Sequence, residues 1–314
     1  MIAPRLPEFV IAGAPKSGTS ALYEWLGSHP DVFLPALKEP HYYSEDLPGL
    51  RAISTHDAYE SLYASAPAGT LRGDCSASYL FSLTAVPRIL EDNPNTRFMA
   101  ILRNPAEAAH AYHSELLYNL SEEVTDFRAA WDLQEVRKRG RRIPAQCREP
   151  RVLQYKEIFS FGDQLERLFS RVPETQRLVL LFDDLEAEPA GAYRRALSFL
   201  GVDDDGRNDF GRVNPNKMLR SRRAAIWHRR ARDVIGPLYA PAKRLANAVG
   251  IYPSHLLSRW NVEELPRAPL DGRFRSHLCR EFAPEVARAE ALLGRSLSSW
   301  LSSGEALGAA TDSQ

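Results

Sequence analysis

The chain has few cysteines, no excess of charge of either sign and no long apolar run. Its 314 residues include three cysteines, Cys75, Cys147 and Cys279, which lie far apart. This number and spacing fit neither a disulfide framework nor a metal site built on closely spaced cysteines, so we expect a reducing compartment. Lysine plus arginine and aspartate plus glutamate each number 40. A chain with this balance is not expected to coat nucleic acid.

No run of about 18 apolar residues, the length that spans a membrane, occurs in the sequence. The start of the chain also lacks the charged and then apolar segments of a signal peptide. We therefore expect a cytoplasmic protein with neither a membrane nor a nucleic acid as partner. With 44% hydrophobic and 25% charged residues, the composition is that of a globular protein. We predict one domain over residues 1–303 and a flexible tail over residues 304–314, which are small and polar.

Three short apolar runs predict buried strands of a parallel sheet, at residues 8–13, 97–102 and 177–182. Helical patterns are predicted at residues 19–28, 161–172, 184–200 and, in a basic stretch, 221–249. Gly201 is a stop signal for the third of these helices. Because strands alternate with helices, we predict an α/β fold with a P-loop-like central parallel sheet flanked by helices on both faces.

The loop between the first strand and the first helix, GAPKSGTS over residues 13–20, has the chemistry of an anion site. Backbone N–H groups and the helix dipole favour an anion at a helix start, and two glycines allow the tight path that such a loop needs. Lys16 adds a positive charge. We predict that a phosphate or phosphosulfate binds here, to Ala14, Pro15, Lys16, Ser17, Gly18, Thr19 and Ser20. A helix N-terminus with a chance lysine is the alternative.

The loop differs from that of nucleoside-triphosphatases, which ends in Gly-Lys-Ser/Thr and places the hydroxyl on magnesium. Here the lysine precedes the second glycine by two positions. A P-loop-type kinase or nucleotide hydrolase therefore stays an alternative that lacks its motif.

Several blocks of the chain, in order, resemble the sulfotransferases that use 3′-phosphoadenosine-5′-phosphosulfate (PAPS), and in particular their bacterial and heparan-sulfate-sulfotransferase-like branch. Residues 12–30 resemble the 5′-phosphosulfate loop, and KEPHYY at 38–43 resembles an acidic motif of that branch. GDCSASYL at 73–80 resembles a substrate-side block, and LRNP at 102–105 resembles the 3′-phosphate block. Weaker landmarks of the family follow at 182–185, 199–201 and 293–300. The ordered series covers nearly the whole chain.

The resemblance implies transfer of a sulfuryl group from PAPS to a hydroxyl or amine of a small molecule or glycoconjugate, without a metal. Lys16 would stabilise the leaving phosphate, and Glu39 would be the general base, since this branch uses a glutamate in the motif. His41 is the competing base, because another branch uses a histidine. A surface Lys38–Glu39 pair and a packed histidine are the structural alternative. On the substrate side the resemblance suggests Lys38, Asp74, Ser76 and Tyr79, of which Tyr79 could instead belong to the core.

At the 3′-phosphate, Arg103 can clamp the anion with two hydrogen bonds. Relatives pair this arginine with a serine eight residues later, but Ala111 stands there in this sequence, so Ser114 or a backbone group would have to substitute. Residues 214–222 resemble a late basic loop that closes over the nucleotide, and this implies further contacts from Lys217, Arg220, Ser221 and Arg222.

Ala111 is also the feature that favours a second alternative, a non-catalytic nucleotide-binding relative. The basic run at residues 137–142 could meet an anionic acceptor or form a solvated loop. The sequence predicts neither the acceptor nor the oligomeric state.

Overall fold

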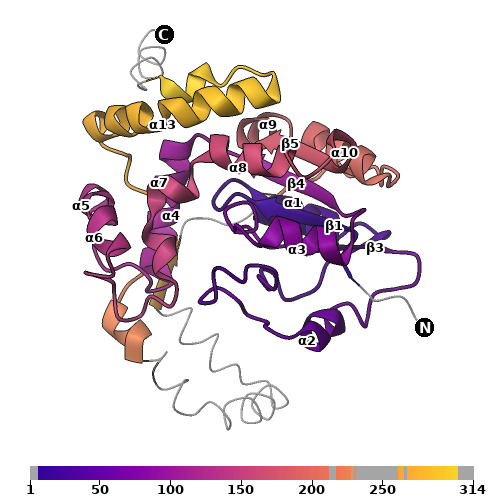
Figure 1. Ribbon diagram of the computed structural model, residues 1–314, viewed down its shortest axis with the longest axis horizontal. Coiled ribbons are helices and arrows are strands. Elements are labelled where there is room, and N and C mark those ends of the chain that lie inside the picture. Colours follow the sequence, from indigo (N-terminus) through magenta and orange to yellow (C-terminus); the bar gives the residue numbers. More distant parts are fainter. Residues whose placement is uncertain (1–5, 212–216, 228–229, 231–260, 265–266, 303–314) are drawn as a thin grey trace.

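The computed structural model describes residues 6–211, 217–227, 230, 261–264 and 267–302, and a parallel five-stranded sheet lies at its centre (Figure 1). The strands are β1 (Phe9–Gly13), β2 (Val32–Phe33), β3 (Leu71–Cys75), β4 (Arg97–Leu102) and β5 (Arg177–Leu181). Their order across the sheet is β2-β3-β1-β4-β5. The carboxyl ends of β1 and β4, the two inner strands with the longest buried runs, therefore lie side by side, as the register of Ile11 with Met99 also shows.

Both faces of the sheet are buried, which explains why its inner strands read as continuous apolar runs. Alternate residues of β1 point into different cores, since Val10 belongs to one hydrophobic cluster and Ile11 to the other. The close pairing of β1 with β3 depends on Gly73, because a Cβ there would lie 2.2 Å from the Phe9 ring. The sheet is thus tightly packed just below the predicted anion loop.

One face is covered by α1 (Thr19–Gly27), α9 (Phe182–Ala187) and α10 (Pro189–Leu200). The other is covered by α3 (Ala85–Asp92), α4 (Pro105–Tyr118), α8 (Phe161–Phe169) and α13 (Gly272–Leu293), the last of which packs on α8 and α4 (Figure 1). The predicted α/β fold, with a P-loop-like sheet between two layers of helices, is confirmed.

Shorter elements complete the described chain. The helices are α2 (His56–Ser61), α5 (Phe127–Asp132), α6 (Gln134–Lys138) and α7 (Tyr155–Ile158), with 3₁₀ turns at Pro150–Leu153, Glu174–Gln176 and Ser298–Leu301. A small antiparallel pair, β6 (Lys217–Leu219) and β7 (Val262–Glu264), lies against α4.

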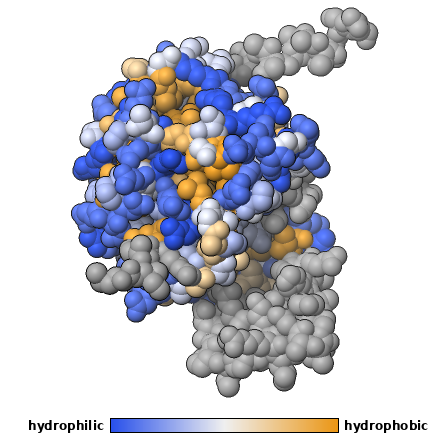
Figure 2. Space-filling view, turned by 90° about the vertical axis from the view of Figure 1, so that its right-hand side faces the viewer, coloured by the Kyte–Doolittle hydropathy of each residue, from blue (hydrophilic) through white to orange (hydrophobic). Residues whose placement is uncertain are grey.

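Figure 2 shows a mostly hydrophilic face with an apolar area at its middle. Within the part of the chain that the structure describes, no helix is long and apolar enough to cross a membrane.

The helix predicted over residues 184–200 was wrong as a single element. It is divided into α9 and α10, because Pro189 has no N–H to continue a helix and Glu188 before it adopts φ −141° and ψ 72°. The predicted stop is confirmed, since Gly201 ends α10 with φ 68°. In the predicted helix over residues 221–249, residues 222–227 are helical, and most of the remainder lies outside the described residues. The predicted tail over residues 304–314 lies outside them as well.

Candidate functional site

The predicted anion loop lies at the carboxyl end of β1 and leads into α1. Lys16 has a left-handed backbone with φ 58°, and Gly18, directly before α1, has φ 99°. A side chain at Gly18 would also meet the Phe182 ring at 3.1 Å. Strained backbone of this kind is common where a loop must present its donors to a ligand. The sequence signal of a glycine-punctuated loop therefore corresponds to a real constraint on the chain.

Not every predicted donor of the loop faces outward. The Ala14 N–H donates to the Ile101 carbonyl at 2.8 Å, and the Ser17 N–H donates to the Ala14 carbonyl at 3.3 Å. Pro15 has no N–H group, and the Ser17 hydroxyl, which is buried, donates to the Pro15 carbonyl at 3.3 Å. The first turn of α1 always carries N–H groups without intrahelical partners. In this loop the N–H groups of Gly18, Thr19 and Ser20, at the start of α1, are the ones that could meet an anion.

Lys16 and Arg103 meet at this loop. The Arg103 guanidinium donates to the Lys16 carbonyl at 3.4 Å and lies 4.3 Å from the centroid of the Phe182 ring. The ammonium of Lys16 lies 2.8 Å from the carboxylate of Glu115 on α4. The next residue, Asn104, caps α4 with its side chain, which accepts from the Ala106 N–H at 3.0 Å. Two of the predicted phosphate-binding cations thus lie together at the carboxyl ends of the inner strands β1 and β4.

The predicted acidic motif is joined to the same loop by a chain of polar contacts. Lys38 donates to the Ser20 hydroxyl at 2.6 Å and lies 3.3 Å from one carboxylate oxygen of Glu39. The other oxygen of Glu39 lies 3.5 Å from Nε2 of His41. Both Glu39 and His41 have left-handed backbones, with φ 59° and 49°. The structure therefore brings Lys38, Glu39 and His41 together with the anion loop.

Burial and the two neighbours Lys38 and His41 act in opposite directions on the pKa of Glu39. Removal of water by the surrounding protein raises the pKa of Glu39, but the hydrogen bond with His41 and the charge of Lys38 outweigh it and hold the pKa at about 2. The Glu39 side chain is 39% exposed, so its carboxylate can meet a ligand from solvent. It is ionised throughout the neutral range.

Asp74, Ser76 and Tyr79 lie behind this loop. Asp74 is buried and accepts hydrogen bonds from the hydroxyls of Tyr59 at 2.7 Å, Tyr79 at 2.8 Å and Ser76 at 2.8 Å. The Ser76 oxygen in turn accepts from the His41 N–H at 3.1 Å. Burial raises the pKa of Asp74, while the three hydroxyls oppose that shift. Of the four residues expected on the substrate side, Lys38 alone is partly exposed, and the other three support the loop from within.

A second cationic centre is formed by Arg103 and Arg267. Arg267 Nε donates to the Ser114 hydroxyl at 3.1 Å, and burial together with the positive charge of Arg103 lowers the pKa of Arg267. Burial and Arg267 also lower the pKa of the neighbouring His110 to about 4, which leaves its ring neutral. Ala111 itself is buried. The predicted Ser114 is therefore placed beside a cation that the sequence did not identify.

The late basic loop has other partners in this structure. Arg220 lies 2.9 Å from Glu263, and the Ser221 N–H donates to the Asn261 side chain at 2.8 Å. Arg222 donates to the Glu122 carbonyl. The side chain of Lys217 lies outside the described residues.

The basic run at residues 137–142 does not form a continuous basic surface, because its first residue is buried. Arg137 is fully buried and makes two hydrogen bonds of 2.6 Å to the carboxylate of Glu122, which also accepts from the Tyr155 hydroxyl at 2.7 Å. Lys138 instead pairs with Glu157 at the surface, at 2.6 Å. The arginine that begins the run is thus a core residue.

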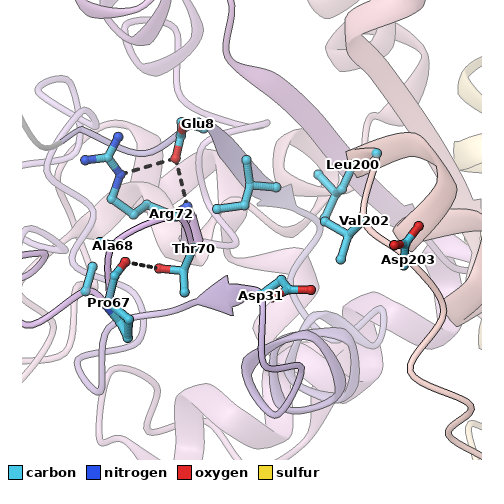
Figure 3. A pocket seen from close by; sticks show the side chains of 13 residues that line it. Glu8, Asp31, Pro67, Ala68, Thr70, Arg72, Leu200, Val202 and Asp203 are labelled. Atoms are coloured by element: carbon cyan, nitrogen blue, oxygen red, sulfur yellow. Dashed lines mark hydrogen bonds and ion pairs between the residues drawn. The ribbon is translucent and has the colours of Figure 1, made fainter.

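A cavity lies at the other end of the strands, away from the anion loop (Figure 3). It is lined by residues at the amino ends of the strands, among them Glu8 before β1, Leu71 of β3 and Asp203 after α10. The ion pair of Glu8 with Arg72, at 3.2 Å, crosses its rim. In open parallel sheets ligands bind outside the carboxyl ends of the strands, so this cavity does not coincide with the predicted anion loop. Among the described residues, no group of three or more His, Cys, Asp or Glu side chains could hold a metal.

Comparisons with known proteins identify the family of this chain. The profile of the sulfotransferase domain matches residues 6–211. The chain is 28% identical over 210 residues to mouse bifunctional heparan sulfate N-deacetylase/N-sulfotransferase 1, covering 63% of this chain and 22% of that protein. It is 27% identical over 198 residues to human heparan sulfate glucosamine 3-O-sulfotransferase 6, covering 63% and 53%. The chain thus spans about a fifth and about half of these relatives.

A solved structure is similar over nearly the whole chain. The sulfotransferase from Alicyclobacillus acidocaldarius superposes with a TM-score of 0.69 at 25% identity, covering 94% of this chain and 98% of that one.

Proposed function

Since this chain belongs to the sulfotransferase domain family, as the order of its motifs predicted, we propose that it transfers the sulfuryl group of PAPS to a hydroxyl or amine. One observation carries the proposal. The chain of contacts from Ser20 through Lys38 to Glu39 and His41 joins an anion loop directly to a carboxylate that can accept a proton. Sulfuryl transfer needs an anion-binding loop for the donor and a base for the acceptor, close enough together to act on the same reacting atoms.

The residues fit a donor with anions at both ends. The start of α1, with the hydroxyls of Thr19 and Ser20, would hold the 5′-phosphate, and Lys16 would neutralise the charge that develops on the leaving phosphate. Arg103, with Arg267 and Ser114, would hold the 3′-phosphate. A loss of the family serine at Ala111 is then offset by an arginine from another part of the chain.

Glu39 is the proposed general base. Its carboxylate is ionised and exposed, so it can take the proton of the acceptor hydroxyl or amine as the bond to sulfur forms. Among the described residues, Nδ1 of His41 has no hydrogen-bond partner, and Nε2 faces Glu39. We therefore assign His41 the role of orienting Glu39. Lys38 balances the charge of the carboxylate before the acceptor arrives.

The acceptor is proposed to be a carbohydrate or another small molecule with a hydroxyl or amine. Two of the relatives have names that state action on heparan sulfate, and the carbohydrate part of the proposal rests on them. The described site adds one constraint of its own. An acceptor must tolerate the partly exposed carboxylate of Glu39 and the ammonium of Lys38 at the reaction centre.

The experiment that tests the proposal is calorimetric titration with 3′-phosphoadenosine-5′-phosphate (PAP), the product nucleotide, without magnesium and in parallel with ATP and magnesium. We expect PAP to bind in the micromolar range or tighter and the Lys16→Ala and Arg103→Ala variants each to weaken it by about tenfold or more. Arg88→Ala, which removes an exposed arginine on α3, is the matched control. Absence of PAP binding, or a preference for ATP with magnesium, would reject the proposed function in favour of a kinase or a non-catalytic relative.

A further inference from the structure

The catalytic lysine of the proposed reaction already has a partner in the protein. The ammonium of Lys16 lies 2.8 Å from a carboxylate oxygen of Glu115, and the two side chains are 29% and 40% exposed. Glu115 projects from the third turn of α4, directly after Ser114, whose hydroxyl faces Arg267. Neither the family motifs nor the local sequence pattern indicated a role for Glu115.

The position of Glu115 conflicts with the donor. A phosphate bound at the start of α1 must approach the ammonium of Lys16, and a carboxylate on that same ammonium would repel it. We expect the donor's phosphate to displace Glu115 from Lys16, because the N–H groups of the loop and the guanidinium of Arg103 attract the donor in addition to Lys16. The carboxylate of Glu115 is half exposed and can turn into water at small cost.

The charge of Glu115 also acts on a second ammonium, that of Lys38. Burial lowers the pKa of Lys38, but Cys75, the charge and hydrogen bond of Glu39 and, least of all, the charge of Glu115 outweigh burial and raise the pKa overall. Glu115 is thus paired with the donor-side lysine, Lys16, and its charge also acts on the acceptor-side lysine, Lys38. A carboxylate released from Lys16 would remain in the electrostatic environment of Lys38.

We propose that Glu115 is a positioning residue that holds the Lys16 ammonium in the donor-free protein. When the donor binds, Lys16 leaves Glu115 and pairs with the donor's phosphate. This inference rests on the proposed function. The ion pair keeps the lysine ordered near its working position, and it competes with the nucleotide for the same ammonium. The competition weakens binding of both donor and product, and a weakened product complex favours release after transfer.

The test is a double-mutant cycle on PAP affinity at low and high salt, with wild type, Glu115→Gln, Lys16→Ala and the double variant. Glu115→Gln is expected to bind PAP about three- to tenfold more tightly than wild type at low salt, and the gain should shrink as salt screens the charges. In the Lys16→Ala background the same change should have no effect. Glu91→Gln, which removes an exposed carboxylate from an ion pair on α3, is the control and should leave affinity unchanged.

The outcomes separate the two proposals. Failure of the wild-type protein to bind PAP rejects the proposed function and this inference with it. Wild-type binding with an unaltered or weakened Glu115→Gln variant overturns the inference alone. So does a gain in affinity that persists without Lys16, because it would arise from general repulsion between Glu115 and the nucleotide. Thermal unfolding of Glu115→Gln within about 2 °C of wild type ensures that the comparison concerns the site, since an exposed ion pair contributes little to stability.

Discussion

The Glu39 carboxylate lies 3.5 Å from the His41 imidazole, and both residues have left-handed backbones although neither is glycine. Such a conformation costs free energy and persists only where the surroundings enforce it. Here the enforcement comes from the end of β3 and the residue after it, because the Glu39 N–H donates to the Cys75 carbonyl at 2.9 Å and the His41 N–H donates to the Ser76 hydroxyl. The geometry of the proposed base is therefore set by the strand behind it.

Replacing Glu39 by glutamine is expected to reduce kcat by about 10² to 10⁴ while PAP affinity changes by less than about threefold, because the amide keeps the shape of the side chain and cannot accept a proton. Sulfuryl transfer to an identified acceptor and calorimetric titration with PAP measure the two quantities. Glu45→Gln, a surface carboxylate paired with Arg88 at 3.5 Å, is the matched control. Unchanged turnover in Glu39→Gln would show that another group is the base.

The pH dependence of the reaction is expected to depend on the hydrogen bond between His41 and Glu39. With its pKa lowered from 4.5 to about 2, Glu39 stays ionised as pH falls to about 4, so wild type should lack an acid limb from this group near pH 4.5. The stabilising effect of the ionised Glu39 is present above its unfolded pKa and is lost as pH falls toward 2. His41→Phe removes the hydrogen bond and should move the acid limb of kcat/KM up toward the ordinary pKa of a glutamate. His41→Gln keeps a donor and should move it less; equal profiles for both variants would contradict this prediction.

Local sequence signals were sufficient for the framework of the site. The buried run of β1, the glycines around Lys16 and the strand before Arg103 all express constraints within a few residues of the chain, and the structure has each of them. The break at Pro189 was missed, although its local signal is present: a proline has no N–H and disfavours helix in the residue before it.

Relationships between distant segments could not be predicted in this way. Arg267 meets Ser114 across 153 positions, and no periodicity or motif links them. β3 was missed as a strand because it contains Arg72 and Asp74, which the apolar pattern of a buried strand does not include. The burial of Asp74 becomes understandable only when the hydroxyls that surround it are known, since an aspartate is rarely buried without partners.

The hydroxyl of Ser76 is expected to matter for both stability and the loop of Glu39. Ser76→Ala removes a donor to Asp74 and the acceptor of the His41 N–H, so the free energy of unfolding should fall by about 1–3 kcal/mol. Urea denaturation measures this loss. Ser44→Ala is the control, because the buried hydroxyl of Ser44 has no hydrogen-bond partner among the described residues and its removal should be nearly neutral. Equal effects of the two changes would mean that the Ser76 contacts contribute nothing specific.

The role of Arg267 is tested by comparing two nucleotides. Arg267→Ala should weaken PAP binding by about 10- to 100-fold, since it removes a charged donor from the proposed 3′-phosphate site. Binding of 5′-AMP, which has no 3′-phosphate, should change by less than about threefold. Arg88→Ala serves again as the control for loss of a positive charge. An equal loss for both nucleotides would place Arg267 elsewhere on the donor or make its role structural.

Two ion pairs of the same length should differ in their effect on stability because one is buried and the other is exposed. Arg137–Glu122 and Lys138–Glu157 both have a shortest N–O distance of 2.6 Å, but the first pair is at most 1% exposed and the second at least 40%. Glu122→Gln leaves a buried guanidinium without its counter-charge, so we expect the free energy of unfolding to fall by about 3–5 kcal/mol. Glu157→Gln should cause almost no change, because water replaces the lost partner.

Burial raises the pKa of Glu122, but the hydrogen bonds from Arg137 and its other donors outweigh burial and lower it. The contribution of this carboxylate is therefore present above its unfolded pKa and is lost as pH falls through the lower folded value. Urea denaturation at several pH values tests both statements. Wild type should lose stability toward low pH more steeply than Glu122→Gln, and Glu157→Gln should follow wild type. If the two glutamine variants were equally stable, the buried pair would contribute no more than a surface contact. The segment from α4 to α6 would then depend on its aromatic packing, such as that of Phe127 on Trp131 and Tyr155, rather than on this charge pair.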